Sequence, residues 1–508
     1  MYKFKEENLL ETELFNLREK LGEISDLDSS LALLSWDQQT YMPPKGAAAR
    51  GRQRATISAL AHRMLTSAEM GERLQRLNER RDELSDGDRA LVDVAIYDYK
   101  RTVCLPEDFV EELTMAQSSG YEAWVASRKD NAFSSFLPYL EKLIDLAKRK
   151  AEYHGYEGSS YNALLEDFER GMTAEQLDSI FGELSLRQSN LVEKITTSSN
   201  QPDITWLERK WPEQPQLDFT LLVLRDMGFD FEAGRQDLAA HPFTTSISLR
   251  DIRLTTRISR DEPFSCLTGS MHEGGHGFYE QGFKESDART PLAKGVSLGI
   301  HESQSRTWEN IIGRSQPFWR YYTPLFLKYL DAGPAKISAD QIFRAINHVR
   351  PSLIRVEADE CTYNLHIILR YEIERALLEG KMAAREIPEA WNARMKELLD
   401  IDVPDDASGC LQDIHWSMGM FGYFPTYALG NIYAAQLFEQ IEKDLPNLWA
   451  EVEAGQFTGL LGWLRRNVHV HGRRKLAPQI VYDSTGSEPS SKPYLQYLEA
   501  KYSKLYSL

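Results

Sequence analysis

The sequence contains few cysteines, and none of them lie close together. There are 4 in 508 residues, and no Cys-x-x-Cys pair occurs. Closely spaced cysteines provide the thiolates of structural zinc sites, and a high density of cysteines marks small secreted domains that depend on disulfides. The sequence therefore predicts neither a disulfide framework nor a thiolate metal site.

Basic residues are fewer than acidic residues. Lys and Arg total 59 against 76 Asp and Glu, which gives a formal net charge of −17. Nucleic acids and anionic membranes attract basic surfaces, so this balance disfavours both as partners. The N-terminus lacks the apolar core of a signal peptide, and no apolar run approaches a membrane-spanning length. We therefore expect a cytoplasmic location.

Apolar residues recur every three or four positions along most of the chain, which predicts amphipathic helices. Such stripes occupy 10–21, 140–151, 177–191 and 367–378. The stretch 244–258 differs, because its Thr, Ile, Ser and Leu roughly alternate and indicate a short pair of strands or one bent strand. No breaker-rich stretch is long enough to indicate an interdomain linker, so we predict a single catalytic domain over 1–508.

The strongest motif is His272-Glu273-Gly274-Gly275-His276. Histidines four residues apart lie one helical turn apart on the same face, so both imidazoles can bind one tetrahedral ion. Glu273 is rotated about 100° from His272 around the helix, and it can serve instead as the general base that activates water. A structural pair of helix-surface histidines is the simpler alternative.

The two adjacent glycines of this motif are unusual in a helix. Each costs roughly 1 kcal/mol relative to alanine in a helix interior. A helix at the floor of a crowded cleft would benefit from their lack of side chains. Close packing against another helix is the alternative.

A catalytic zinc site usually has a third protein ligand. Glu280 lies on the same helical face as the histidines, but it is about 12 Å along the axis from His272, too far to share the ion. The metzincin spacing for a third histidine is not met either. The next candidates are His301 and Glu302, and the spacing alone does not choose between them.

Other short motifs flank this helix in a defined order. They are Leu34-Ser35-Trp36-Asp37-Gln38-Gln39-Thr40-Tyr41-Met42-Pro43-Pro44-Lys45-Gly46, His241-Pro242-Phe243, Asp251-Ile252-Arg253-Leu254-Thr255, His301-Glu302-Ser303-Gln304, Ile354-Arg355-Val356-Glu357-Ala358-Asp359 and Gly409-Cys410-Leu411-Gln412-Asp413-Ile414-His415-Trp416. Together with the His-Glu-Gly-Gly-His motif, this ordered set resembles the M32 family of metallocarboxypeptidases. The resemblance covers nearly the whole chain.

The resemblance implies that Glu302 is the third metal ligand. It also implies a mainly α fold, a large helical gluzincin-like architecture with a small β-sheet and a deep active-site groove, and a homodimer. The activity it implies is removal of single residues from peptides with a free C-terminus, with broad specificity. The metal it implies is Zn²⁺, with Co²⁺ in some members.

An enzyme that cuts at the C-terminus must recognise a free carboxylate, and the arginine fork binds both carboxylate oxygens. Arg355 is the first candidate and Arg253 the second. The alternative for each arginine is an ion pair within its own motif, with Asp359 or Asp251 respectively.

Four further residues are candidates for substrate contact. Gln412 and His415 can hold the substrate terminus, or they can support the metal site from outside. The hydroxyl of Tyr423 can donate to the oxyanion that forms on the attacked carbonyl. His241 can touch substrate or cap the strand region.

Two other functions fit part of this pattern. A helical zinc oligopeptidase would use the same metal site to cut internal peptide bonds. A non-catalytic helical scaffold could keep the metal as a structural clip, but such a clip has no use for Glu273.

Overall fold

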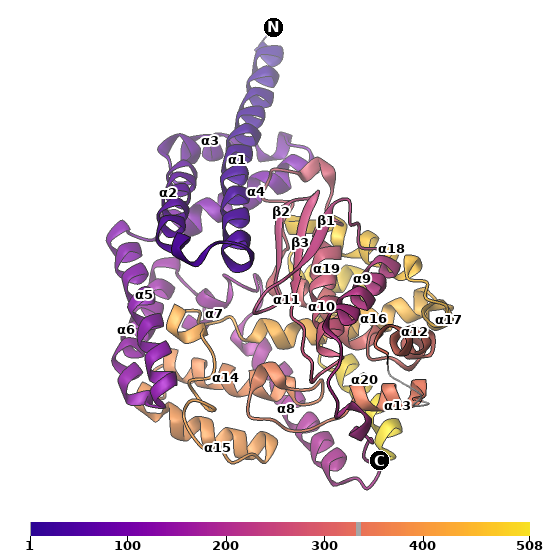
Figure 1. Cartoon of the computed structure of the whole chain (residues 1–508). Helices are drawn as coiled ribbons and strands as arrows, with labels where there is room; N and C mark the ends of the chain where they lie inside the picture. The colour runs from indigo at the N-terminus through magenta and orange to yellow at the C-terminus, as the bar shows by residue number, and fades with distance from the viewer. Residues whose placement is uncertain (1, 332–336) are drawn as a thin grey trace.

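The computed structural model describes residues 2–331 and 337–508, and the side chains of these residues from position 9 onward. Residue 1 and residues 332–336 of the predicted 1–508 domain lie outside the described residues. Helices form most of the described chain, and one small sheet lies among them (Figure 1). The predicted mainly α fold with a small sheet is confirmed, whereas the single domain stays a prediction.

The chain begins with four helices, and the first, third and fourth of them share a separate apolar core. The four helices are α1 (Tyr2–Thr40), α2 (Ala47–Leu65), α3 (Ala68–Glu79) and α4 (Asp86–Val103). The apolar stripe of α1 buries Leu17 and Leu21 against α3 and α4, and Leu292 from the rest of the chain joins the same cluster. Figure 1 shows the N-terminal part of α1 projecting beyond the other helices.

The main hydrophobic core extends over the remaining helices, and the other three predicted stripes lie within it. The stripes belong to α6 (Phe133–His154), α8 (Ala174–Thr197) and α14 (Tyr363–Leu378), which bury Leu140, Leu177 and Ile367 completely. The other helices of this part are α5 (Glu107–Asp130), α7 (Ser160–Leu165), α9 (Glu213–Met227), α12 (Gln316–Tyr329), α13 (Ala339–Ile346), α15 (Ile387–Leu399), α17 (Leu448–Glu453), α18 (Thr458–Asn467), α19 (Ala477–Thr485) and α20 (Lys492–Tyr506). Among the described helices, none is long and apolar enough to cross a membrane.

The sheet contains β1 (Gly234–Leu238), β2 (Thr244–Ser248) and β3 (Asp251–Thr256), in the order β1-β3-β2. The stretch 244–258 forms a pair of strands and not the one bent strand that its alternation also allowed. Strand β2 pairs antiparallel with β3, and β1 pairs with β3 in parallel. Strand β1 was not predicted, because Gly-Arg-Gln-Asp-Leu is mostly polar and has no apolar alternation. The central β3 buries Ile252 and Leu254 completely.

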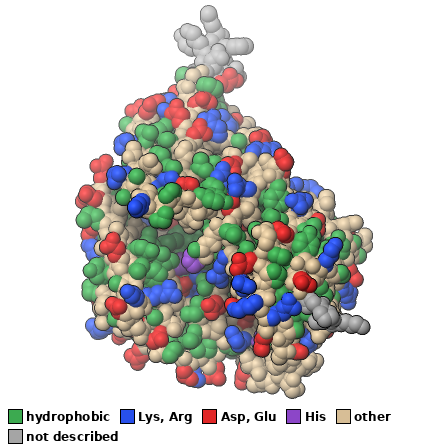
Figure 2. Space-filling model, in the orientation of Figure 1, with side chains coloured by type: hydrophobic (Ala, Val, Ile, Leu, Met, Phe, Trp, Pro, Cys, Tyr) green, Lys and Arg blue, Asp and Glu red, His purple; other side chains and the backbone are tan. Residues whose placement is uncertain are grey.

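Three helices and one π-helical turn pack against one another, and one of these helices also packs against the sheet. They are α10 (Ser265–Glu280), α11 (Leu298–Arg306), the π-helical turn η5 (Thr307–Ile312) and α16 (Pro425–Asp444). Helix α10 packs against β3 on one side and α11 on another, and α11 packs closely against α16. Figure 2 shows a hollow in the middle of the molecular face, with histidine atoms visible inside it.

Candidate active site

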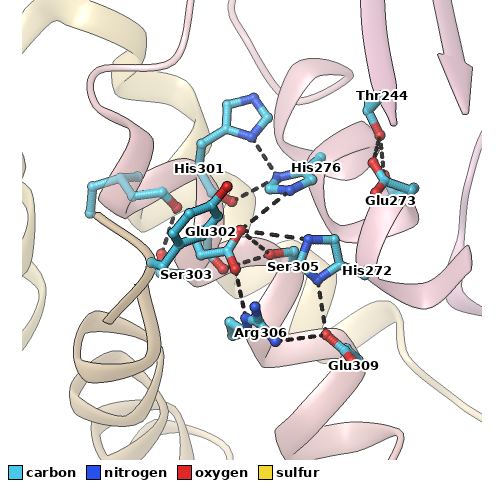
Figure 3. Close-up of polar contacts among 12 residues, drawn as sticks. Thr244, His272, Glu273, His276, His301, Glu302, Ser303, Ser305, Arg306 and Glu309 are labelled. Carbon is cyan, nitrogen blue, oxygen red and sulfur yellow. Dashed lines mark hydrogen bonds and ion pairs between the residues drawn. The ribbon is translucent and has the colours of Figure 1, made fainter. Parts of the chain in front are cut away.

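Helix α10 carries both histidines of the His-Glu-Gly-Gly-His motif. Their spacing puts the two imidazoles on one face, and Glu302 of α11 points toward them (Figure 3). Glu302 Oε2 lies 3.6 Å from His272 Nε2 and 3.6 Å from His276 Nε2. The structure therefore brings together the three residues that were predicted to bind the metal, with their ligand atoms within 4.8 Å of one another.

The spacing of these atoms fits a small divalent ion. Nitrogen and oxygen ligands lie about 2.0–2.2 Å from zinc, which in a tetrahedral site places neighbouring ligand atoms about 3.4 Å apart. The two nitrogen–oxygen distances of 3.6 Å are close to that separation. Two imidazoles and one carboxylate also leave a fourth tetrahedral position open, as a catalytic site requires.

The outer ring nitrogen of each histidine has its own partner. His272 Nδ1 lies 2.9 Å from Glu309 Oε2, and His276 Nδ1 lies 3.0 Å from the backbone oxygen of His301. An Nδ1–H that donates to such an oxygen leaves the Nε2 lone pair free to bind a metal. Both histidines are therefore oriented with Nε2 toward Glu302.

The electrostatic surroundings of His272 favour positive charge. Burial opposes its protonation, but Glu302 and Glu309 outweigh burial and raise the pKa of His272 to about 9. Burial, together with His301 and His272, lowers the pKa of His276 well below its usual range. The centre thus combines a neutral imidazole with carboxylates that stabilise a nearby cation, which suits a divalent metal.

Arg306 lies between the two carboxylates of this centre. Its Nε donates to Glu302 Oε1 at 2.6 Å, and its Nη1 donates to Glu309 Oε2 at 3.2 Å. Because Arg306 occupies Oε1, Glu302 Oε2 is left to face the histidines. Neither Arg306 nor Glu309 was predicted, although spacings of four and seven residues from Glu302 place both near its helical face.

The Glu273 carboxyl group lies outside the group of potential ligand atoms and contacts β2. The side chain is buried, and burial raises the pKa of its carboxyl group. Its Oε2 accepts a hydrogen bond from the Thr244 hydroxyl at 2.7 Å. A carboxylate whose pKa is raised binds a proton more strongly than an ordinary carboxylate, as a general base must.

His301 and Glu280 were weighed as ligands from sequence, and they interact with each other. His301 Nε2 lies 2.9 Å from Glu280 Oε1, and His301 Nδ1 lies 2.6 Å from His276 Nδ1. Neither residue belongs to the group of potential ligand atoms found among the described residues. Glu302, which faces the opposite side of His276, belongs to that group instead.

The two glycines of the motif serve close packing. A Cβ on Gly275 would lie 2.5 Å from Ser305 Cα and 2.6 Å from the Gln304 oxygen, both backbone atoms of α11. A Cβ on Gly274 would meet Leu224 of α9. Of the two explanations offered by the sequence, packing against neighbouring helices accounts for both positions.

Replacing Gly275 with alanine is therefore expected to destabilise the fold by about 1–3 kcal/mol, the usual cost of overpacking. The added methyl group must push α10 and α11 apart, so metal affinity should fall as well. Chemical denaturation and a metal competition assay measure the two effects. Gly274→Ala is the matched comparison and should cost less, because the one close contact of its Cβ is with Leu224 Cδ2, a side-chain atom and not backbone. Equal losses in both variants would contradict the special role of the close backbone contact between α10 and α11 at Gly275.

Arg355 is buried beside a second arginine and one aspartate. Its Nη2 donates to Asp413 Oδ1 at 2.8 Å, and Arg370 Nε donates to Asp413 Oδ2 at 2.7 Å. The alternative partner considered for Arg355, Asp359, instead accepts backbone N–H groups from residues that include Arg350. Burial would raise the pKa of Asp413, but Arg370 and Arg355 lower it well below its usual range. The cluster therefore carries two positive charges against one negative charge.

The other C-terminal candidates lie around this cluster. Gln412 Oε1 accepts the backbone N–H of Arg355 at 2.8 Å, so Gln412 supports Arg355 and has no recorded contact with the metal-site residues in the described chain. The ring of His415 lies 5.1 Å from that of Tyr423, and burial lowers the pKa of His415 to about 4. Tyr363 connects the two regions, because it accepts from Arg355 Nη1 and stacks on Arg306.

Arg253 and His241 lie on the sheet side of the site. Arg253 on β3 forms a two-bond ion pair with Asp251, as the alternative interpretation proposed, and its guanidinium lies 4.3 Å from the Trp36 ring centre. His241 is exposed just before β2. Neither residue contacts the Arg355 cluster in the described structure.

A helical fold in which a His-Glu-x-x-His helix meets a carboxylate from a neighbouring helix defines a metallopeptidase architecture. The chain matches the model of the "Carboxypeptidase Taq (M32) metallopeptidase" family over residues 16–502. It belongs to that family.

Individual relatives agree with this assignment. The chain is 41% identical to Carboxypeptidase 1 of Bacillus subtilis, with 98% of this chain and 99% of that protein aligned. Thermostable carboxypeptidase 1 of Thermus thermophilus is also 41% identical, with 97% and 98% aligned. An M32 carboxypeptidase from Deinococcus radiodurans R1 superposes with a TM-score of 0.96 at 39% identity, covering 98% of this chain and 100% of that one. The predicted family and its metallocarboxypeptidase function are confirmed.

Proposed function

We propose that the protein removes single residues from the free C-termini of peptides with broad specificity, using a zinc centre formed by His272, His276 and Glu302. The observation that carries this proposal is the convergence of His272 Nε2, His276 Nε2 and Glu302 Oε2. A bound zinc ion would supply a Lewis acid that polarises the scissile carbonyl and lowers the pKa of a water toward about 7. The same two-nitrogen, one-oxygen set also suits Co²⁺, which is the alternative metal.

Glu273 is the proposed general base. It follows His272 directly, so its side chain leaves α10 beside the metal ligands and not among them. The carboxylate takes a proton from the attacking water and then donates it to the departing amino group. Its raised pKa supports this double role, because the group must bind and release a proton in each turnover.

Arg355 is the proposed anchor for the C-terminal carboxylate. The surplus positive charge of Arg355 and Arg370 over Asp413 supports this role, because a substrate carboxylate would balance the cluster. Gln412 holds the backbone of Arg355, and His415 lies near the same cluster. Tyr423, whose ring neighbours His415, is the proposed donor to the oxyanion. Arg253 and His241 are proposed contacts for more distant substrate residues.

The direction of cleavage can be tested with one unmodified peptide and its C-terminal amide. Mass spectrometry should show a ladder that shortens from the C-terminus of the free peptide when zinc or cobalt is present. Amidation removes the charge that Arg355 recognises, so kcat/KM should fall by about 10- to 150-fold, which corresponds to one hydrogen bond between charged groups. Internal cleavage of both peptides at similar rates would favour the oligopeptidase alternative.

Arginine variants show which side chain recognises the carboxylate. Arg355→Met should remove most of the difference between free and amidated peptides. Arg253→Met serves as the matched control and should preserve the difference. The reverse result would transfer the role from Arg355 to Arg253.

A homodimer and a cytoplasmic location also belong to this proposal, and both stay predictions.

A further inference from the structure

Thr244, the first residue of β2, contacts the proposed general base directly. Its hydroxyl oxygen lies 2.7 Å from Glu273 Oε2 and 2.9 Å from the Glu273 backbone oxygen (Figure 3). Within the described structure, the Glu273 carboxylate has no hydrogen bond other than the one from the Thr244 hydroxyl to Oε2.

The hydroxyl of Thr244 has one proton to donate, and the two oxygens of Glu273 compete for it. A backbone oxygen inside an α-helix already accepts the N–H four residues later. A carboxylate is the stronger acceptor, because hydrogen bonds to charged groups are about twice as strong as neutral ones. The proton therefore goes to Oε2.

Thr244 is itself held firmly relative to α10. The preceding residue, Phe243, exchanges backbone and side-chain hydrogen bonds with Thr255 on β3, at 2.8 Å and 2.9 Å. Thr255 is completely buried, and β3 packs directly against α10. A β-branched threonine side chain is also stiff about its first torsion. The Thr244 hydroxyl is therefore held in a fixed position, whereas the longer glutamate side chain beside it has more rotatable bonds.

We infer that Thr244 is a positioning residue for Glu273, which holds Oε2 so that Oε1 is directed at the water to be deprotonated. The inference rests on the proposed role of Glu273 as general base. A glutamate side chain has three rotatable torsions, and fixing one oxygen removes most of their freedom. Reactions of this kind lose rate steeply when a reacting group is misplaced by even about 1 Å.

The test is Thr244→Val, which keeps the shape of the side chain and removes the hydroxyl. We expect kcat to fall by about 10-fold or more, the value of one hydrogen bond to a charged group. KM and the bound metal content should remain unchanged, because Thr244 has no recorded contact with His272, His276 or Glu302. Thr244→Ser restores the hydroxyl and should recover most of the lost kcat.

Thr245→Val is the matched control, because adjacent residues of a strand point to opposite faces. It should leave kcat unchanged. If Thr244→Val folds poorly, Thr244→Ala and Thr244→Ser form a second pair that differ chiefly in the hydroxyl. Equal kcat in that pair, or full kcat in Thr244→Val, would overturn the inference.

A double-mutant cycle separates this inference from the proposed function. When Glu273 is replaced with Gln, adding Thr244→Val should cause little further loss, because the positioned group is already gone. A full additional loss would mean that Thr244 acts through another residue, and the inference would be wrong. High turnover in Glu273→Gln alone would instead overturn the role of Glu273.

Discussion

Glu273→Gln is expected to lower kcat/KM by about 10²- to 10⁴-fold, the range that general acid–base catalysis contributes. The amide has nearly the same shape as the carboxylate, but it cannot take a proton from water. Thr244 can still donate to the amide oxygen, so the side chain should keep its place beside β2. Steady-state kinetics on an unmodified peptide measure the loss.

Metal content and folding serve as controls for this variant. The ligand atoms of His272, His276 and Glu302 are untouched, so bound zinc should remain stoichiometric and the unfolding midpoint should change little. Glu273→Asp is the informative companion, because it keeps the charge but shortens the side chain, and it should retain more activity than Gln. Near-full turnover in Glu273→Gln would show that another group accepts the proton.

Much of the fold could be predicted from local patterns. The stripes in α1, α6, α8 and α14 follow the helical period, and the buried face of each helix is the one that the spacing indicates. Strand β1 shows the limit of this approach. Its Gly-Arg-Gln-Asp-Leu segment is a strand because β3 offers a partner edge, and such pairing depends on a residue far along the chain.

The candidate site also has residues that local sequence patterns predict and residues that they do not. His272, Glu273 and His276 follow from helix geometry, and Arg306 and Glu309 carry a local signal in their spacing from Glu302. The spacing left the choice between His301 and Glu302 open, and the family resemblance selected Glu302. Adjacent residues on α11 face different directions, and the tertiary arrangement shows that Glu302 is the one that faces the two histidines. The pairing of Arg355 with Asp413 joins positions 58 residues apart, and the nearer Asp359 was the wrong candidate. Long-range ion pairs of this kind leave no periodic pattern in a sequence.

Glu302→Gln is expected to lower metal affinity by more than about 100-fold, because even partners one step removed from a metal are worth up to that factor. The amide oxygen can still accept from Arg306, so the local packing should persist while the anionic ligand is lost. Activity should fall in proportion to the metal that remains bound. A competing chelator measures affinity, and elemental analysis measures the bound metal.

His301→Gln is the matched control for this prediction, since it removes the other residue that sequence spacing allowed as third ligand. Its imidazole contacts Glu280 and His276 rather than the shared centre. A smaller loss of affinity is therefore expected, through the orientation of His276 alone. If Glu302→Gln bound metal normally and His301→Gln did not, the third ligand would be His301. The carboxylate held by Arg306 would then have no direct role at the metal, and its 3.6 Å approach to both histidines would reflect packing of α11 against α10.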